Sequence, residues 1–284
     1  MLRPSRPVPG SDRSLVAITP AGAGWSHVGF QVYRVSRGAR IRKRTGTREL
    51  CAVVLLGRFD ITFAEHEWRG VGSREGLFEG PPDAVYVPPG GVISMTAISE
   101  RAEVALCWAQ ARKGATPSLI RGDGIEPLTR GGGRTERTIH PILMEDREAE
   151  SLLVSETLTP GGNWSSYPPH KHDTDNLPAE SLLEETYYHR LARPEGFAVQ
   201  LVYSGDRSLD EAFQVHDGDV VLVPRGFHAV AASPGCDLYY LNVMAGPRRR
   251  WLVTTDPDHR WQLEQVGFDH EPAHPGRAVR PHHA

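Results

Sequence analysis

The sequence predicts an all-β protein built as a sandwich or barrel. Its 29 glycines and 23 prolines suit many short strands joined by turns rather than long helices. The apolar runs show no sustained helical period, and Gly or Pro interrupts them roughly every eight to twelve residues. Together these features favour a strand-rich core.

The first half of the chain supplies a series of predicted strands. FQVYRVS alternates from Phe30, and the apolar run over Leu50–Phe63 predicts a buried strand that leads into a second one. Asp83–Gly91 reads as a strand ending in a Pro-Gly turn, followed by the runs ISMTAIS and AEVALCWAQA. Residues 1–29, rich in Pro and Gly, are expected to wrap over another part of the molecule.

A change of composition divides the chain. Between Lys113 and Thr138 the sequence turns to Gly, Thr and Arg, which predicts a flexible connector. We therefore place an N-terminal domain at 1–125 and a C-terminal domain at 126–284. The RGGGR run at Arg130–Arg134 lacks the GxGxxG spacing and the strand–helix context of a phosphate loop.

The second half repeats the outline of the first. Its predicted strands are Leu152–Thr159, Gly196–Ser204, Gly218–Val230 and Asp237–Gly246. DAVYVPPGGVISMTA and DVVLVPRGFHAVAA share an Asp, an apolar strand, Val-Pro, a Gly turn and a return strand. Where the second copy has His228, the first has Val92 or Ile93, so the pattern indicates a duplicated fold in which only the second copy carries polar ligands.

Composition excludes several classes of protein. A net charge of −3 gives no general argument for nucleic acid, and the basic run at Arg40–Arg48 is interpreted as solvated charge on an edge strand. No apolar run is long enough to cross a membrane, and the first residues lack the apolar core of a signal peptide. Cys51, Cys107 and Cys236 are widely spaced, which favours reduced thiols in a cytoplasmic protein.

Three histidines and a glutamate predict a metal site. His170 and His172 are separated by one residue, so on an extended strand they point to the same face. A carboxylate follows at Glu184 or Glu185, and His228 arrives on a later strand. Three imidazoles and one carboxylate suit a borderline divalent metal with room for a substrate.

This order of ligands is that of the cupin superfamily, although a longer insert separates His172 from Glu185 than in the usual motif. PPHKHD, LEETYYHR, YSGDRSLDE, GDVVLVPRGFH and DLYYLNVMAGPRRRW together resemble the 5-deoxy-glucuronate isomerases of bacterial myo-inositol catabolism, over roughly Phe30 to Trp251. The resemblance implies a bicupin, with two tandem cupin (double-stranded β-helix or jelly-roll) barrels. The N-terminal barrel would be a degenerate copy without ligands.

The resemblance also implies an activity and a cofactor. The expected enzyme is an aldose–ketose isomerase that converts 5-deoxy-glucuronate to 2-deoxy-5-keto-gluconate with one divalent ion, Zn²⁺ or Mn²⁺. The implied ligands are His170, His172, Glu185 and His228. The related isomerases carry E-x-aromatic-aromatic, which selects Glu185 over Glu184, and strand alternation then turns Tyr187 and His189 to the side of Glu185.

The chemistry requires a proton carrier and an anion-binding group. The candidates for proton transfer are His189, Glu184 and Tyr240; Lys171 is disfavoured because it alternates away from its neighbouring ligands. Arg225, three residues before His228, is the candidate clamp for the substrate carboxylate, with Arg190 as its alternative. The expected partner is a small sugar acid, and a homo-oligomer is compatible with this fold.

Two other functions fit the same ligands. An Fe(II)-dependent cupin dioxygenase uses a similar ligand set, and a non-catalytic sugar-binding cupin would keep the fold without turnover. The histidines of the C-terminal tail have loose spacing and polar neighbours, so they are expected to lie in a partly ordered segment: His259, His270, His274, His282 and His283.

Overall fold

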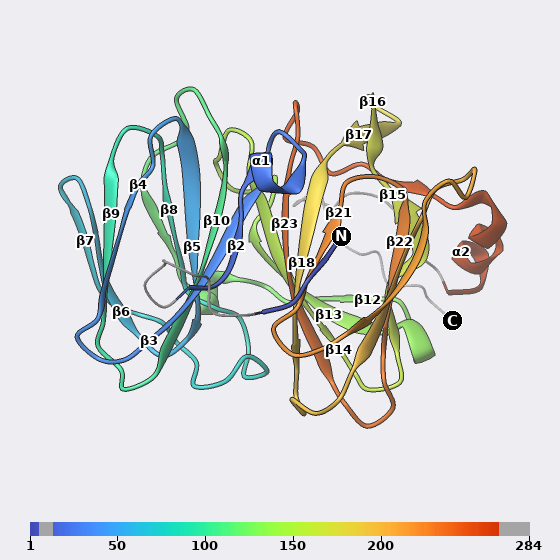
Figure 1. Cartoon of the computed structure of the whole chain (residues 1–284), viewed down its shortest axis with the longest axis horizontal. Coiled ribbons are helices and arrows are strands. Elements are labelled where there is room, and N and C mark those ends of the chain that lie inside the picture. The colour runs from blue at the N-terminus through green and yellow to red at the C-terminus, as the bar shows by residue number, and fades with distance from the viewer. Residues whose placement is uncertain (6–13, 267–284) are drawn as a thin grey trace, which may run out of the picture.

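The computed structural model describes residues 1–5 and 14–266, and β-strands dominate it (Figure 1). Its helices are α1 (Pro20–Ala23) and α2 (Trp261–Val266), and its 3-10 turns are η1 (Gly122–Gly124), η2 (Gly133–Thr135) and η3 (Pro257–His259). No helix in the described ranges reaches the length or apolar character of a membrane span. The predicted all-β fold is confirmed. His270, His274, His282 and His283 lie outside the described residues.

The first half forms two facing sheets. The six-stranded sheet has the order β11 (Ser118–Ile120), β8 (Ala84–Val87), β5 (Arg48–Leu56), β10 (Ala102–Gln110), β3 (Gly29–Val35) and β2 (Ser14–Ile18). The four-stranded sheet has the order β4 (Arg40–Arg44), β9 (Val92–Ala97), β6 (Phe59–Phe63) and β7 (His66–Val71). Apolar side chains such as Ile61, Ile93 and Leu106 fill the space between them.

The second half forms a larger pair of sheets. The seven-stranded sheet has the order β1 (Leu2–Arg3), β21 (Val220–Val223), β18 (Glu184–Leu191), β23 (Leu238–Ala245), β14 (Leu153–Thr159), β13 (Arg137–Leu143) and β12 (Leu128–Arg130). The five-stranded sheet has the order β20 (Asp210–Val215), β19 (Ala198–Tyr203), β22 (Phe227–Ala232), β15 (Trp164–Lys171) and β24 (Thr254–Thr255). A hairpin of β16 (Asp173–Asn176) and β17 (Glu180–Leu182) occupies the insert before Glu185.

The strand order of the first half recurs in the second. The run β8-β5-β10-β3-β2 corresponds to β21-β18-β23-β14-β13, and β4-β9-β6-β7 corresponds to β15-β22-β19-β20. In this correspondence the second residue of β9, Ile93, takes the place of His228 in β22. Ile93 is fully buried in the apolar core of the first half, which explains why that copy needs no polar ligand there.

The two large sheets pack against each other at the centre of the molecule (Figure 1). Phe30 and Tyr86 from the six-stranded sheet share one apolar cluster with Tyr188 and Leu241 from the seven-stranded sheet. The rings of Phe30 and Tyr188 lie 5.5 Å apart. The halves are therefore joined by a continuous core, and β18 presents its outward face to that core and its inward face to the second sandwich.

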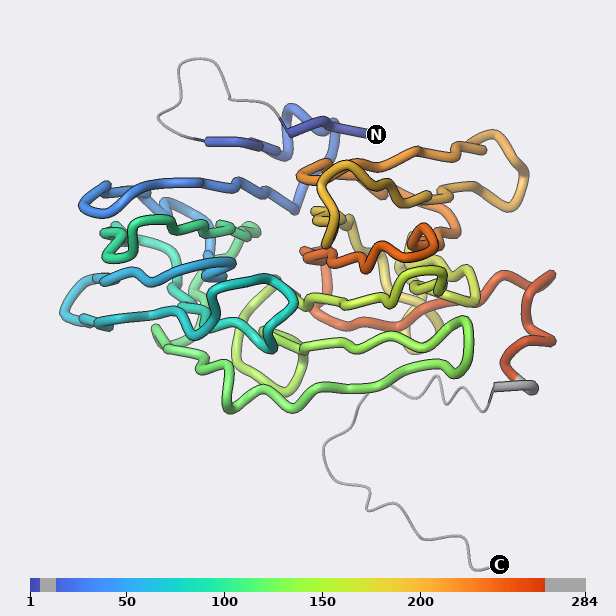
Figure 2. The backbone as a smooth tube through the Cα atoms, turned by 90° about the horizontal axis from the view of Figure 1, so that it is seen from below, coloured from blue at the N-terminus to red at the C-terminus, as the bar shows by residue number. Residues whose placement is uncertain are grey.

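The connector between the halves is not a flexible segment as predicted. β11 pairs with β8 of the first half, while β12 pairs with β13 of the second, with η1 between them. The predicted boundary at 125/126 falls between β11 and β12. At the other end of the chain, β1 pairs with β21, so residues 2–3 lie on the sheet of the second half (Figure 2).

Candidate metal centre

Three strands bring the predicted ligands together inside the second sandwich. His170 and His228 are direct partners in the pairing of β15 with β22, while Glu185 comes from β18 on the opposite sheet. Nitrogens of His172 and His228 and a carboxylate oxygen of Glu185 all lie within 4.8 Å of one another. The ring of His170 lies 4.7 Å from that of His228 and 6.4 Å from that of His172, at the side of this group.

Backbone carbonyls orient all three imidazoles in the same way. The Nδ1 atoms of His170, His172 and His228 lie 3.3, 3.1 and 3.1 Å from the carbonyl oxygens of Pro168, Leu183 and Gly226, respectively. A carbonyl only accepts hydrogen bonds, so each Nδ1 carries a proton and donates it. The tautomer leaves each Nε2 as the nitrogen available to a ligand, which is the usual arrangement behind metal-binding histidines.

Glu185 is held as an anion at the centre of this group. Its Oε2 lies 3.0 Å from Nε2 of His172 and 3.4 Å from Nε2 of His228, and Asn242 donates its side-chain N–H to Oε1 at 2.7 Å. Burial alone would raise the pKa of Glu185, but the adjacent imidazoles outweigh it and lower the pKa to about 2. The carboxylate therefore stays ionised throughout the neutral range.

The residues fit a divalent cation. Nε2 of His228 is fully buried and has no hydrogen-bonding partner, which is costly in an apolar interior. Burial, followed by the neighbouring imidazoles, lowers the pKa of His170 well below its usual value, so this imidazole is neutral. Three imidazole nitrogens and one carboxylate oxygen are the donors that Zn²⁺ and similar borderline ions accept.

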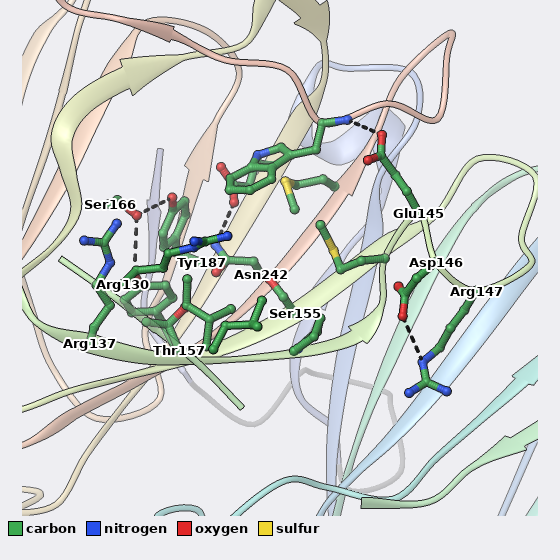
Figure 3. A pocket seen from close by; sticks show the side chains of 18 of the residues that line it. Arg130, Arg137, Glu145, Asp146, Arg147, Ser155, Thr157, Ser166, Tyr187 and Asn242 are labelled. Atoms are coloured by element: carbon green, nitrogen blue, oxygen red, sulfur yellow. Dashed lines mark hydrogen bonds and ion pairs between the residues drawn. The ribbon is translucent and has the colours of Figure 1, made fainter. Parts of the chain in front are cut away.

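A cavity of about 480 Å³ opens onto this group, and much of its wall is the inward face of the seven-stranded sheet (Figure 3). Direct cross-strand pairing places Tyr187 beside Asn242, Asn242 beside Ser155, and Tyr240 beside Thr157. The full lining comprises Gly124, Glu126, Leu128, Arg130, Arg137, Ile139, Pro141, Met144, Glu145, Asp146, Arg147, Ser155, Thr157, Ser166, His170, Glu185, Tyr187, Tyr240, Asn242, Met244 and Trp251. The cavity is therefore large enough for a small organic ligand that reaches Glu185 and His170.

Comparison with known proteins now identifies the family. The family model described as "KduI/IolB family" matches residues 2–262. The chain belongs to the KduI/IolB family. It is 50% identical over 258 residues to the 5-deoxy-glucuronate isomerase of Geobacillus thermodenitrificans, covering 90% of this chain and 93% of that protein. It is 44% identical to the enzyme of the same name from Bacillus subtilis strain 168, covering 87% and 92%.

Solved structures confirm the cupin architecture of this KduI/IolB chain. An IolB-like protein from Salmonella typhimurium LT2 superposes with a TM-score of 0.88 at 40% identity, covering 92% of this chain and 98% of that one. A mutant of the oxalate decarboxylase of Bacillus subtilis superposes with a TM-score of 0.62 at 14% identity, covering 90% and 80%. The second likeness concerns the fold alone.

Two of the residues predicted for the site, Glu184 and Arg225, lie elsewhere. Glu184 alternates to the other face of β18, where its carboxylate accepts N–H groups from Ser26, His27 and Val28 at 2.6, 2.7 and 3.0 Å. Arg225 is exposed in the turn between β21 and β22 and does not line the cavity. Neither is placed to touch a ligand in the cavity, because a strand alternates its faces and a turn directs its central side chains outward.

Tyr240 does line the cavity, and so does Ser166, whose hydroxyl the sequence patterns did not suggest. Ser166 Oγ lies 3.0 Å from the hydroxyl of Tyr187 and 3.3 Å from that of Tyr240 (Figure 3). Lys171 instead donates to Asp173 at 2.6 Å and to Glu180 at 2.8 Å, away from the ligands, as strand alternation predicts. The three hydroxyls, of Ser166, Tyr187 and Tyr240, form a polar layer next to the candidate metal centre.

His189 lies beyond this layer rather than on the cavity wall. It is fully buried, donates from Nε2 to Oε1 of Gln200 at 2.7 Å, and packs against the rings of Tyr187 and Tyr240 at 6.0 and 5.8 Å. Its tautomer is thus opposite to that of His170, His172 and His228. His189 is in contact with both tyrosines that border the cavity, which suits a positioning role for their rings.

The buried imidazole of His189 makes stability depend on pH. Burial lowers its pKa from 6.5 to about 4, so between these values the unfolded chain binds a proton that the folded chain does not. The free energy of unfolding therefore falls as the pH drops from 6.5 to about 4, by about 3 kcal/mol for this group. We expect His189→Gln to lose that part of the pH dependence in urea unfolding measured between pH 7 and pH 4.5. An unchanged slope would contradict the assignment.

The sequence analysis missed three polar residues that line the cavity: Asn242, Arg130 and Arg137. Asn242 has the same parity as Tyr240 along β23, so the alternation of DLYYLNVMAG could have revealed it. Arg130 and Arg137 belong to the segment interpreted as a connector, where no strand periodicity was visible. Their position becomes evident only once β12 and β13 are paired.

Proposed function

We propose that this chain is a metal-dependent aldose–ketose isomerase that converts 5-deoxy-glucuronate to 2-deoxy-5-keto-gluconate in myo-inositol catabolism. The observation that carries the proposal is 50% identity, across nearly the whole length of both chains, to a protein named 5-deoxy-glucuronate isomerase. The geometry agrees with it, because a cavity for a small molecule is lined by His170 and Glu185, and Glu185 is grouped with His172 and His228.

His170, His172, Glu185 and His228 would hold one divalent ion, Zn²⁺ or Mn²⁺. Such an ion, when bound, polarises a carbonyl and offsets the negative charge that develops as the neighbouring carbon loses its proton. Asn242 keeps Glu185 oriented toward the histidines through its 2.7 Å hydrogen bond. The carbonyl groups behind each Nδ1 keep the imidazoles in the tautomer that the site requires.

The hydroxyls of Tyr187, Ser166 and Tyr240 are the groups best placed to handle protons. Burial raises the pKa of Tyr187 well above its usual value, so its hydroxyl stays protonated and can donate to a substrate oxygen. Ser166 lies within hydrogen-bond distance of both tyrosines, so a proton can pass between them through its Oγ. Among the predicted proton carriers, Tyr240 is therefore the one we retain.

The proposal is tested by incubating metal-loaded protein with 5-deoxy-glucuronate and following the reaction by NMR. Loss of the aldehyde signal with the appearance of a ketone, without oxygen consumption, is the expected result. Metal analysis should give about one Zn or Mn per chain. Stoichiometric iron together with oxygen uptake would favour a dioxygenase, and tight binding without turnover would favour a sugar-binding protein.

A further inference from the structure

We propose that Asp173 is a positioning residue of the candidate metal centre, acting on His228 through the backbone of Gly226. The inference deepens the proposed function and rests on it in one respect, since it takes the three imidazoles and Glu185 to hold a divalent ion. Asp173 begins the segment that separates His172 from Glu185 by more residues than the usual cupin motif has. The insert would therefore have a role in metal binding.

The insert folds as a short hairpin at one end of the second sandwich (Figure 1). β16 begins at Asp173, directly after His172, and Asp173 pairs with Leu182 at the end of β17. The next residue, Leu183, donates its N–H to the carbonyl of His172 at 2.9 Å, and its own carbonyl oxygen lies 3.1 Å from Nδ1 of that histidine. The end of the hairpin thus already orients one of the imidazoles.

The side chain of Asp173 connects the hairpin to the turn that precedes His228. Its Oδ2 accepts the backbone N–H of Gly226 at 2.8 Å. The carbonyl oxygen of the same glycine lies 3.1 Å from Nδ1 of His228. Among the described residues this is the one hydrogen bond of the His228 ring, because its Nε2 has no hydrogen-bond partner. The orientation of the imidazole therefore depends on where the Gly226 carbonyl is held.

Gly226 cannot be replaced by a bulkier residue that would hold its own conformation. Its φ is +92°, and a Cβ at this position would lie 2.6 Å from the carbonyl oxygen of Tyr203. The backbone of glycine is the least restricted by its own atoms, so neighbouring groups must fix the direction of its carbonyl. The hydrogen bond from its N–H to Asp173 provides such a restraint.

Ion pairs keep the carboxylate of Asp173 in place. Nζ of Lys171 lies 2.6 Å from Oδ1 of Asp173 and 2.8 Å from Oε1 of Glu180. Glu180 also accepts the backbone N–H of Asp173 at 2.9 Å. The side chains of Asp173 and Glu180 are only 19% and 6% exposed, so solvent screens these contacts little. Because Lys171 engages one oxygen of Asp173 and Gly226 the other, the carboxylate is held in a single orientation.

The test measures how tightly metal-free protein binds Zn²⁺, by competition with a chromophoric chelator, and records the absorption spectrum of Co²⁺ bound in its place. Asp173→Ala should weaken Zn²⁺ binding by about 10- to 100-fold and shift the Co²⁺ bands, because the group that orients a ligand is no longer fixed. Asp173→Asn should bind Zn²⁺ more tightly than Asp173→Ala, because its amide oxygen can still accept the N–H of Gly226.

Two further variants separate this role from the stability of the hairpin. Lys171→Met removes the ion pairs with Asp173 and Glu180 but leaves an acceptor for Gly226, so it should lower thermal stability and cost less Zn²⁺ affinity than Asp173→Ala. Asp175→Asn is the matched control, because Asp175 lies in the same hairpin with an exposed side chain 3.8 Å from Nε of Arg248. It should keep the parent affinity and Co²⁺ spectrum.

The inference is overturned if folded Asp173→Ala binds Zn²⁺ as tightly as the parent, if Lys171→Met or Asp175→Asn loses as much affinity, or if the unmodified protein binds neither ion. Circular dichroism shows whether each variant is folded. Asp173→Leu, which has a similar shape without an acceptor, replaces Asp173→Ala if that variant does not fold. Zn²⁺ binding that depends on Asp173, without isomerisation of 5-deoxy-glucuronate by the unmodified protein, would sustain the inference and contradict the proposed function.

Discussion

Replacement of His172 by Ala is expected to remove the metal and to lower kcat/KM for isomerisation on the order of a thousandfold or more. Loss of a group that merely orients a ligand typically costs 10- to 100-fold, roughly, so loss of a ligand itself should exceed this. His172 is one of three residues whose ligand atoms lie within 4.8 Å, and its Nε2 is the closest imidazole nitrogen to Glu185, at 3.0 Å. The measurement is metal content by elemental analysis together with steady-state kinetics.

His216→Ala provides the control for this experiment. His216 is exposed and lies 3.3 Å from the carbonyl of Gly196, outside the cavity lining. The control should keep both metal and turnover, and His172→Ala should unfold cooperatively because the core of the second half rests on apolar side chains such as Val202 and Leu238. A His172→Ala variant with one metal per chain and undiminished turnover would refute the site.

Replacement of Arg74 by Met is expected to destabilise the protein by about 3–5 kcal/mol. Arg74 donates to both carboxylate oxygens of Glu156 at 2.8 and 2.9 Å, and their side chains are 2% and 0% exposed. His140 and Tyr239 complete the environment of Glu156 at 2.7 and 2.8 Å. Burial alone would raise the pKa of Glu156, but Arg74 and then His140 lower it, so the variant leaves a buried, poorly compensated carboxylate.

Denaturant unfolding measures this effect. In the double variant Arg74→Met, Glu156→Met much of the lost stability should return, because apolar replacements of a buried ion pair are often tolerated. Arg69→Met, which breaks the exposed pair of Arg69 with Glu67 at 2.8 Å, should leave the midpoint unchanged. If Arg74→Met unfolds at the same denaturant concentration as the parent, the buried pair of Arg74 with Glu156 does not contribute to stability.

The sequence was sufficient where a local pattern determines the direction of a side chain. The motif of the related isomerases selects Glu185, strand alternation then turns Glu184 the other way, and the structure shows these two carboxylates on opposite faces of β18. The duplicated Val-Pro turn likewise predicts that Val92 or Ile93 matches His228, and the structure selects Ile93. In each case the information lies within a few consecutive residues, which is the range over which periodicity operates.

The sequence alone did not predict how distant segments of the chain pair. Arg130 and Arg137 meet only because β12 and β13 align across a Gly-rich turn, and a register is not encoded in composition. Arg225 looked suitable because it is near His228 in sequence, yet the turn exposes it. His189 lies on the predicted face of β18 but is buried behind Tyr187 and Tyr240 rather than on the cavity wall. Alternation along the strand predicts the face of a residue, but not which side chains cover it.

The hydrogen bonds of Glu184 show how the first half of the chain supports the candidate metal centre of the second half. Its carboxylate accepts hydrogen bonds from three successive backbone N–H groups at residues 26–28, and the next residue, Glu185, belongs to the candidate metal centre. We therefore expect that the second sandwich does not fold stably without the first. Expressed by itself, it would lack the hydrogen bonds to Glu184 and would expose Tyr188 and Leu241 to water. Residues 26–28 of the first half thus help to fix the position of the strand that carries Glu185.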